Sequence, residues 1–277
     1  MKKSNDVSDG VMTKLKIGIL NIMHDKKDTK NRFTNVLTNT QTPVELRFFY
    51  PVSHYRNRPV PKDVSTMLEP LDLNKVKDLD GFIITGAPVE QLAFEEVDYW
   101  DELTVLMDFL DQQHIWQLYV CWGAMAAGYH FYGVHKHALP KKVFGIQAHK
   151  VVNNSPLLNG MGKTFFAPHA RYAEMDRQAF LQAGVVEIAR SEKGCLFLLE
   201  DRPQRRTFLF AHLEYGRNAL KSEYEREWQA KVAQREHLAQ PKNYYNLNGQ
   251  PTFSWKNTQR NFFNNWLYQI KETRKLK

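Results

Sequence analysis

Short apolar runs that end abruptly at glycine, proline or polar residues recur along the first half of the chain, with stretches of helical character between them. The β-prone runs are Leu15–Met23, Val44–Tyr50, Gly81–Thr85 and Ile115–Val120. The helical stretches lie around Arg32–Leu37, over Glu95–Leu110 and from Gly123 onward. Strands that alternate with helices at this spacing predict an α/β fold, with a mostly parallel sheet flanked by helices on both faces.

The second half of the chain continues this pattern, which favours a single domain. Its strand candidates are Val185–Ala189, Cys195–Leu199 and Thr207–Ala211, followed by a charged helix from Asn218 to about Gln234 and an aromatic segment around Trp255–Ile270. No internal repeat and no Gly/Ser-rich linker separates a second core. We expect a flexible segment over residues 1–14, one α/β domain over residues 15–270 and a basic tail over residues 271–277.

The charge and cysteine content exclude several classes of function. The 277 residues carry a formal charge of +8, which suits a nucleic acid or a small anionic ligand, but the basic residues are dispersed and form no nucleic-acid-binding motif. Two cysteines provide neither a disulfide framework nor a Cys-rich metal site. No run approaches the roughly 20 apolar residues of a membrane span, and residues 1–10 lack a secretory signal. We expect a cytoplasmic protein with no metal, nucleic-acid or membrane partner.

Cys121 is the first candidate for chemistry, because ligands of open parallel sheets lie beyond the carboxyl ends of the strands. It directly follows the run Ile115–Val120, and a helix rich in small residues begins after it. A thiol on such a strand-to-helix turn is held exposed, and its thiolate is stabilised by the positive end of the helix. A buried apolar cysteine is the alternative. Cys195 lies inside an apolar run, and we expect it in the core.

A thiol nucleophile needs a base and a group that orients the base. His212 and Glu214 follow the strand candidate Thr207–Ala211. If the chain is still extended there, residues two apart project to the same side, so both side chains can face Cys121. Three other histidines are rivals for the base and are otherwise interpreted as polar loop residues or substrate contacts: His24, His149 and His169.

A candidate oxyanion hole lies at the end of another strand. Free amides of Gly86 and Ala87 can combine there with the amide of Trp122, although a simple turn explains the same residues. Together with the thiol and the imidazole, this arrangement predicts a cysteine enzyme that transfers acyl groups or cleaves amides.

A series of short motifs runs in order from about Leu15 to Ile270. It comprises Leu20–Met23 with Lys26 and Lys27, then Thr85–Glu90, Val97–Trp100, Val120–Ala124, Phe166–His169, His212 to Tyr215, Asn243–Tyr245 and Asn265–Leu267. This series resembles the MetA family of homoserine O-acyltransferases. The resemblance implies a fold like that of the class I glutamine amidotransferases, which is flavodoxin-like.

The resemblance also implies roles for individual residues. Cys121 would carry the acyl thioester, His212 would be the general base and Glu214 its partner. Lys142 and Arg226 would contact the amino-acid acceptor, and a planar guanidinium suits a carboxylate. Lys26 and Lys27 are candidates for contacts with the coenzyme's phosphates.

Glu90 and Ala170 bear on the substrates. The resemblance implies that glutamate at position 90 accompanies acetyl-CoA and glycine accompanies succinyl-CoA, because a glutamate would repel the succinyl carboxylate. Ala170 stands where the family commonly carries serine after Ala-Pro-His, and Ala148 stands where an acidic residue commonly precedes His149. These departures leave the acceptor open between L-serine, which is slightly favoured, and L-homoserine, since one methylene contributes only about 1 to 3 kcal/mol of discrimination.

The leading interpretation is an O-acetyltransferase of cysteine or methionine biosynthesis that uses acetyl-CoA as co-substrate, with no permanently bound cofactor. The alternatives are a homoserine O-succinyltransferase and a glutamine amidotransferase-like hydrolase with the same Cys-His-Glu set. A basic binding module with a relic triad is a third. The expected partners are small molecules, and the chain is compatible with a homodimer.

Overall fold

The computed structural model describes residues 14–230 and 238–275. Its strands are β1 (Leu15–Leu20), β2 (Val44–Tyr50), β3 (Glu69–Pro70), β4 (Gly81–Ile84), β5 (Trp116–Val120), β6 (Lys136–Val151), β7 (Thr164–Met175), β8 (Val186–Ser191), β9 (Leu196–Asp201) and β10 (Arg206–Leu209). Its α-helices are α1 (Lys26–Thr38), α2 (Lys62–Met67), α3 (Leu73–Val76), α4 (Trp100–Gln112), α5 (Trp122–Tyr132), α6 (Arg177–Gln182), α7 (Ala219–Ala230) and α8 (Lys256–Lys275), and its short 3-10 helices are η1 (Ser53–Tyr55), η2 (Phe94–Glu96) and η3 (Pro156–Leu158).

The strands form one mixed sheet in the order β3-β2-β1-β4-β5-β10-β9-β8-β6-β7. The five neighbouring pairs from β3 to β10 are parallel. The four pairs from β10 to β7 are antiparallel. The predicted α/β class with a mostly parallel sheet is therefore confirmed, and an antiparallel extension is added to the parallel part.

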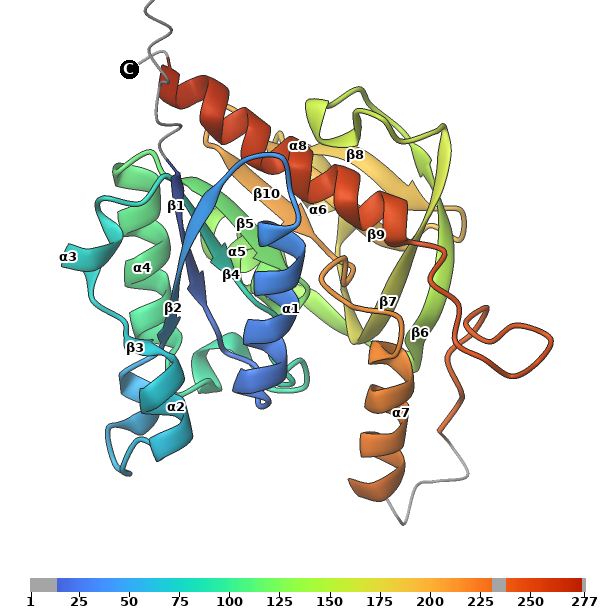
Figure 1. Cartoon of the computed structure of the whole chain (residues 1–277), viewed down its shortest axis with the longest axis horizontal. Coiled ribbons are helices and arrows are strands. Elements are labelled where there is room, and N and C mark those ends of the chain that lie inside the picture. The colour runs from blue at the N-terminus through green and yellow to red at the C-terminus, as the bar shows by residue number, and fades with distance from the viewer. Residues whose placement is uncertain (1–13, 231–237, 276–277) are drawn as a thin grey trace, which may run out of the picture.

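Helices cover both faces of this sheet (Figure 1), and each face has its own apolar core. Neighbouring residues on a strand point to opposite faces. Ile83 of β4 accordingly packs with α1 and α8, whereas Phe82 and Ile84 pack with α4 and α5. Strands buried on both faces are continuous apolar runs, which is why the sequence reveals them.

The longest strands, β6 and β7, are the main elements that the sequence patterns do not predict. They pair from Lys136↔Met175 to Lys150↔Thr164, with an irregular register between Ala138 and Val143. The first half of β6 is exposed and rich in Lys and His, so it lacks the apolar pattern of a buried strand. Pairing with β7, rather than its own burial, makes it a strand.

The ends of the expected domain are only partly covered by the described residues. Residues 1–13 of the expected N-terminal segment and residues 231–234 of the expected charged helix lie outside them. Helix α8 continues through residues 271–275, so most of the expected basic tail is helical. The division into a domain and two tails stays a prediction.

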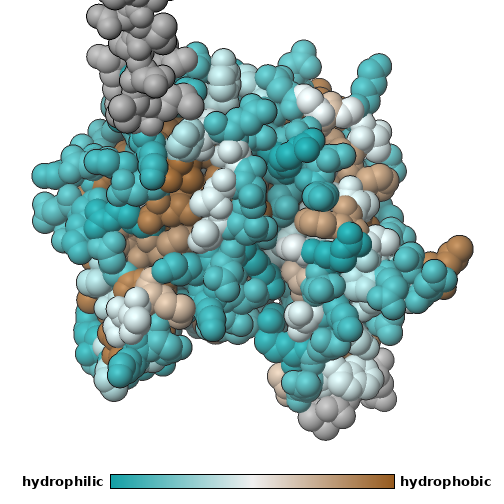
Figure 2. Space-filling view, in the orientation of Figure 1, coloured by the Kyte–Doolittle hydropathy of each residue, from teal (hydrophilic) through white to brown (hydrophobic). Residues whose placement is uncertain are grey.

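The face of the molecule in Figure 2 is mainly hydrophilic. Figure 2 shows one face of the molecule, where hydrophobic residues form separate patches between hydrophilic ones. Within residues 14–230 and 238–275, no helix combines the length and the apolar character that a membrane crossing requires.

Candidate active site

The carboxyl ends of the parallel strands border a cavity of about 430 Å³, a volume typical of small-molecule sites. In Figure 1, the arrows of β1 and β2 point toward the lower edge of the molecule. The wall of the cavity is formed by Met23, His24, residues 86–92, Cys121, Lys142, Ala170, Tyr172, His212, Tyr215, Glu223, Arg226 and Glu227. The fold therefore brings most of the sequence-predicted site residues to one cavity.

Cys121 lies in the turn between β5 and α5, at the position that the sequence predicts. Its φ of +51° is rare for a residue other than glycine and holds the side chain against the cavity wall. Gly123 permits this sharp turn, because a Cβ there would lie 2.7 Å from the carbonyl oxygen of Thr85. The thiol consequently sits at the N-terminal end of α5, where the helix dipole favours negative charge.

His212 and Glu214 form a buried pair next to Cys121. The imidazole Nδ1 lies 2.7 Å from Glu214 Oε1, which leaves Nε2 for the thiol. Although burial alone lowers the pKa of His212, the negative charges of Cys121 and Glu214 and hydrogen bonds to both raise it well above its usual value. The three residues thus form a connected Cys-His-Glu set.

The local geometry of this set differs from the extended chain considered above. Strand β10 ends at Leu209, and residues 212–215 form a turn closed by a hydrogen bond from the Tyr215 amide to the His212 carbonyl (3.1 Å). The turn brings Glu214 to the Nδ1 side of the ring instead of facing Cys121. Tyr215 also stacks on the imidazole, with the ring centroids 4.4 Å apart.

The rival histidines occupy different environments. His149 and His169 are not loop residues: they lie on β6 and β7 and are completely buried, with their Nε2 atoms 2.8 Å apart. Neither lines the cavity, so the interpretation of these two as loop residues or substrate contacts is wrong. His24 does line it.

Cys195 is half-exposed rather than part of the core. It lies in the tight turn before β9, where its amide donates to Ser191 Oγ (3.0 Å). The apolar run begins to be buried only at Leu196. Cys195 does not line the cavity.

Gly86 and Ala87 lie directly opposite the thiol and the imidazole. A Cβ on Gly86 would come within 3.3 Å of Cys121 Cβ and 3.7 Å of His212 Cε1, so glycine keeps this space open. Among the described residues, no acceptor is found for the amides of Gly86 and Ala87. Trp122 is completely buried and does not line the cavity, so a role of its amide stays a prediction.

A second group of charges lines the cavity beside α7. Lys142 Nζ donates to Glu223 Oε1 (2.5 Å) and to Glu227 Oε1 (2.6 Å). The Tyr215 hydroxyl donates to Glu223 Oε2 and the Tyr172 hydroxyl to Glu227 Oε2, both at 2.8 Å. Burial alone would raise the pKa of Glu223, but the charges of Lys142 and His212 and the hydrogen bonds from Lys142 and Tyr215 lower it below its usual value. The cavity therefore holds a carboxylate that stays ionised.

Sequence reasoning missed Glu223 and Glu227. Their signal is the spacing of Glu223, Arg226 and Glu227, which places all three on one face of a helix. Arg226 is exposed, and no described residue forms an ion pair or hydrogen bond with its guanidinium. It is free to bind an anion, whereas Lys142 has already committed two of its three N–H donors.

Glu90 and Ala170 also line the cavity. Glu90 Oε1 accepts a hydrogen bond from the Tyr172 amide (3.1 Å), and burial raises the pKa of the carboxyl group. Ala170 lies two residues before Tyr172 on β7, so the hydroxyl of a serine at position 170 would face the same space. Ala148, the other departure from the family pattern, does not line the cavity.

The two lysines considered for the coenzyme's phosphates are also outside the cavity wall. Lys26 Nζ donates to the Asn21 carbonyl oxygen (2.8 Å), and burial lowers its pKa to about 8. Lys27 is exposed on α1. Contact of either lysine with a coenzyme stays a prediction.

Comparisons with known proteins show which family the chain resembles. A family model described as homoserine O-succinyltransferase matches residues 1–275. A serine O-acetyltransferase from Lactobacillus acidophilus is 47% identical over 264 residues, covering 94% of this chain and 97% of that protein. A homoserine O-acetyltransferase from Acetivibrio thermocellus is 36% identical over 266 residues, covering 94% and 86%.

Solved structures show the same fold. A glutamine amidotransferase from Thermotoga maritima superposes with a TM-score of 0.61 at 11% identity, over 94% of this chain and 99% of that chain. The predicted likeness to glutamine amidotransferases is confirmed at the level of the fold.

Proposed function

The chain belongs to the homoserine O-succinyltransferase family, and from this premise we propose that it is an O-acetyltransferase that passes an acetyl group from acetyl-CoA through Cys121 to L-serine. The observation that carries the proposal is the Cys121–His212–Glu214 set beside an ionised carboxylate and a free guanidinium in one cavity. The choice of serine is supported by the higher identity to the relative named serine O-acetyltransferase than to the one named homoserine O-acetyltransferase.

In the first step, the Cys121 thiolate attacks the carbonyl carbon of acetyl-CoA. Amides of Gly86, Ala87 and Trp122 stabilise the oxyanion, and the coenzyme leaves as a thiol after taking the proton of the His212 imidazolium. A new thioester on Cys121 replaces the thioester of the coenzyme. Because acylated Cys121 carries no charge, one cause of the raised pKa of His212 disappears, and the imidazole remains neutral.

In the second step, neutral His212 acts as the general base. Its Nε2 accepts the hydroxyl proton of the amino acid while that oxygen attacks the thioester on Cys121. Glu214 accepts a hydrogen bond from Nδ1 and so keeps Nε2 available. Release of the ester restores the thiolate and the imidazolium.

The charges beside α7 suit the acceptor. An amino acid presents an ammonium and a carboxylate on one carbon, and the cavity offers Glu223 for the former and Arg226 for the latter. The planar guanidinium can hold a carboxylate through two hydrogen bonds. Lys142, which donates to Glu223, retains one N–H donor in the same cavity.

The acceptor preference tests the proposal directly. At one fixed acetyl-CoA concentration, we expect kcat/KM for L-serine to exceed that for L-homoserine by about tenfold, the effect of one poorly fitted methylene. Release of free thiol measures the reaction. A clear preference for homoserine would refute the serine assignment, and thiol release that needs no amino acid would support a hydrolase instead.

Ala170→Ser should move this ratio toward homoserine, because it restores a hydroxyl on the cavity wall. The change expected from one hydrogen bond is about threefold to tenfold. Ala148→Ser on the neighbouring strand is the matched control, since Ala148 is outside the cavity wall. Equal shifts in the two variants would contradict a role for position 170.

Glu90 is proposed to exclude succinyl-CoA. Two carboxylates a few ångströms apart in a partly desolvated site repel by about 1 to 4 kcal/mol, so Glu90→Gly should raise kcat/KM for succinyl-CoA by about tenfold or more. Glu90→Gln keeps the volume and removes the charge, which separates repulsion from crowding. The pKa of Glu90 is raised, so its carboxylate becomes protonated as the pH falls and no longer repels the succinyl group. The ratio of kcat/KM for acetyl-CoA to that for succinyl-CoA should therefore decrease in the wild type.

Glu95→Gln provides the control for the donor experiment. Glu95 lies five residues further along the chain, in η2, and does not line the cavity, so its substitution should leave the donor ratio unchanged. A wild-type enzyme that uses both donors equally well would show that Glu90 excludes nothing.

A further inference from the structure

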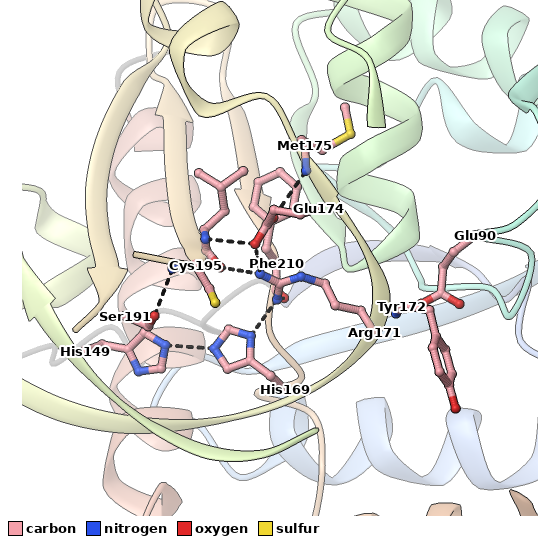
Figure 3. Close-up of polar contacts among 11 residues, drawn as sticks. Glu90, His149, His169, Arg171, Tyr172, Glu174, Met175, Ser191, Cys195 and Phe210 are labelled. Atoms are coloured by element: carbon pink, nitrogen blue, oxygen red, sulfur yellow. Dashed lines mark hydrogen bonds and ion pairs between the residues drawn. The ribbon is translucent and has the colours of Figure 1, made fainter. Parts of the chain in front are cut away.

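Strand β7 has a second face that the proposed reaction does not use. Ala170 and Tyr172 line the cavity, whereas His169 and Arg171 project into the interior and are completely buried (Figure 3). Burial of a guanidinium is costly unless its donors are satisfied. The groups that Arg171 contacts therefore identify the segments that it holds in place.

Arg171 joins three segments that are distant in the sequence. Its Nη1 donates to the Phe210 carbonyl oxygen (2.6 Å), and its Nη2 donates to the Leu196 carbonyl oxygen (3.1 Å). Nη2 also contacts Glu174 Oε2 at 2.6 Å, which supplies the opposite charge. The guanidinium thus ties β7 to the start of β9 and to the chain just after β10.

The two buried histidines extend this hydrogen-bond network from Arg171 through His169 to His149. Nη1 of Arg171 lies 2.5 Å from His169 Nδ1, and since a guanidinium only donates, this nitrogen accepts. The proton of neutral His169 is then on Nε2, which donates to His149 Nε2 (2.8 Å). Burial and the charge of Arg171 lower the pKa of both rings, that of His149 to about 3, so the pair is neutral at physiological pH.

This network holds the segment that carries His212. The Phe210 carbonyl is bound by Arg171, and the His212 amide donates to the Pro168 carbonyl oxygen (3.0 Å), so β7 fixes the chain on both sides of Ala211. Strand β10 ends at Leu209, and beyond it the Phe210 amide still donates to the Phe197 carbonyl oxygen of β9 (2.8 Å), so the contacts with β7 add to this one bond to the sheet. We propose that Arg171, supported by His169 and His149, is a positioning residue that sets where the imidazole of His212 meets Cys121.

This inference rests on the proposed acetyl transfer and assigns Arg171 no contact with the substrates. A stabilising ion pair elsewhere provides the comparison: Arg177 pairs with the buried Glu187 at 2.5 Å, and its side chain hydrogen-bonds to no described residue that lines the cavity. The carboxylate of Glu187 is more deeply buried than that of Glu174 and keeps only the longer contact with Arg190 (3.5 Å) in Arg177→Met, so this variant controls for general destabilisation.

The experiment compares Arg171→Lys, Arg171→Met and Arg177→Met with the wild type, after thermal melting has shown which are folded. We expect kcat to fall about 100-fold in Arg171→Met, as for a misplacement of about 1 Å, and about tenfold in Arg171→Lys, which keeps the charge but not the fork. The KM values for acetyl-CoA and the amino acid should change less than threefold. Arg177→Met should keep kcat within twofold.

The pH profile of the acetyl-CoA half-reaction distinguishes positioning from a loss of charge. Removing a nearby positive charge would by itself raise the pKa of His212, whereas weaker contacts with Cys121 and Glu214 would lower it. We expect the alkaline limb to move to lower pH in both Arg171 variants. Tyr215, Glu223 and Glu90 also face the imidazole and are unchanged in both variants. His169 interacts with His212 as well and loses the Arg171 contact, and any positive charge that it gained would likewise lower the pKa of His212.

Three outcomes would overturn the inference. The first is a folded Arg171 variant with kcat within twofold of the wild type. The second is the same loss of kcat, with the same shift of the pH limb, in Arg177→Met. The third is an alkaline limb that moves upward. If Arg171→Met does not fold, Arg171→Lys decides. A wild type without transfer to any amino acid would instead refute the proposed function, before any variant is compared.

Discussion

Cys121→Ala should abolish acetyl transfer, with activity below about 10⁻⁴ of the wild-type value, because no second cysteine and no serine or threonine lines the cavity among the described residues. Cys121→Ser should be almost as inactive, since a hydroxyl is far less acidic than a thiol. Intact mass measured after mixing with acetyl-CoA alone should show one added acetyl group on the wild type and none on either variant.

Cys195→Ala is the matched control for this experiment. Cys195 is the other cysteine of the chain and is more exposed than Cys121, so nonspecific acetylation of thiols would occur there first. We expect Cys195→Ala to retain both the acetyl adduct and the turnover. A Cys121→Ala enzyme with near-normal turnover would refute the covalent mechanism.

His212→Ala should lower kcat by about 10²- to 10⁴-fold, the usual contribution of a general acid or base. Both half-reactions should slow, because the imidazolium protonates the leaving coenzyme and the imidazole later deprotonates the acceptor. In the wild type, the first half-reaction should persist well above pH 6.5 and decline as the pH rises through the raised pKa of His212. Rapid-quench measurement of the acetylated enzyme resolves the two steps.

His130→Ala is the control for the loss of a histidine. His130 on α5 forms the same kind of pair, with Nε2 2.7 Å from Asp108 Oδ1, but it lies outside the cavity wall. Its substitution should leave kcat within twofold. Similar losses in the two variants would mean that His212 contributes to stability rather than to proton transfer. Glu214→Gln should fall between them, because the amide still contacts Nδ1 but carries no charge.

Local sequence was sufficient to locate the centre of the site. The apolar run of β5 ends at Cys121, and the small residues that follow begin α5, so the strained turn and the helix end are properties of adjacent residues. The strand after which Gly86 and Ala87 lie is likewise a continuous apolar run. Such features depend on backbone preferences and hydrophobic patterning, which act over a few residues. The end of the Thr207–Ala211 run likewise indicated His212 and Glu214, and the resemblance to a known family added Lys142 and Arg226.

Only the tertiary structure decided which polar groups are partners. Lys142 meets Glu223 across 81 residues of chain, and Arg171 meets Phe210 across 39. The tertiary structure also decided that Cys195 is partly exposed and that His149 and His169 form a buried neutral pair, where sequence patterns predicted the core and the loops. These contacts form because burial removes water from charged and polar groups, which must then find partners wherever the fold provides them. Periodicity records which face of an element is buried, but it does not record which distant residue packs against that face.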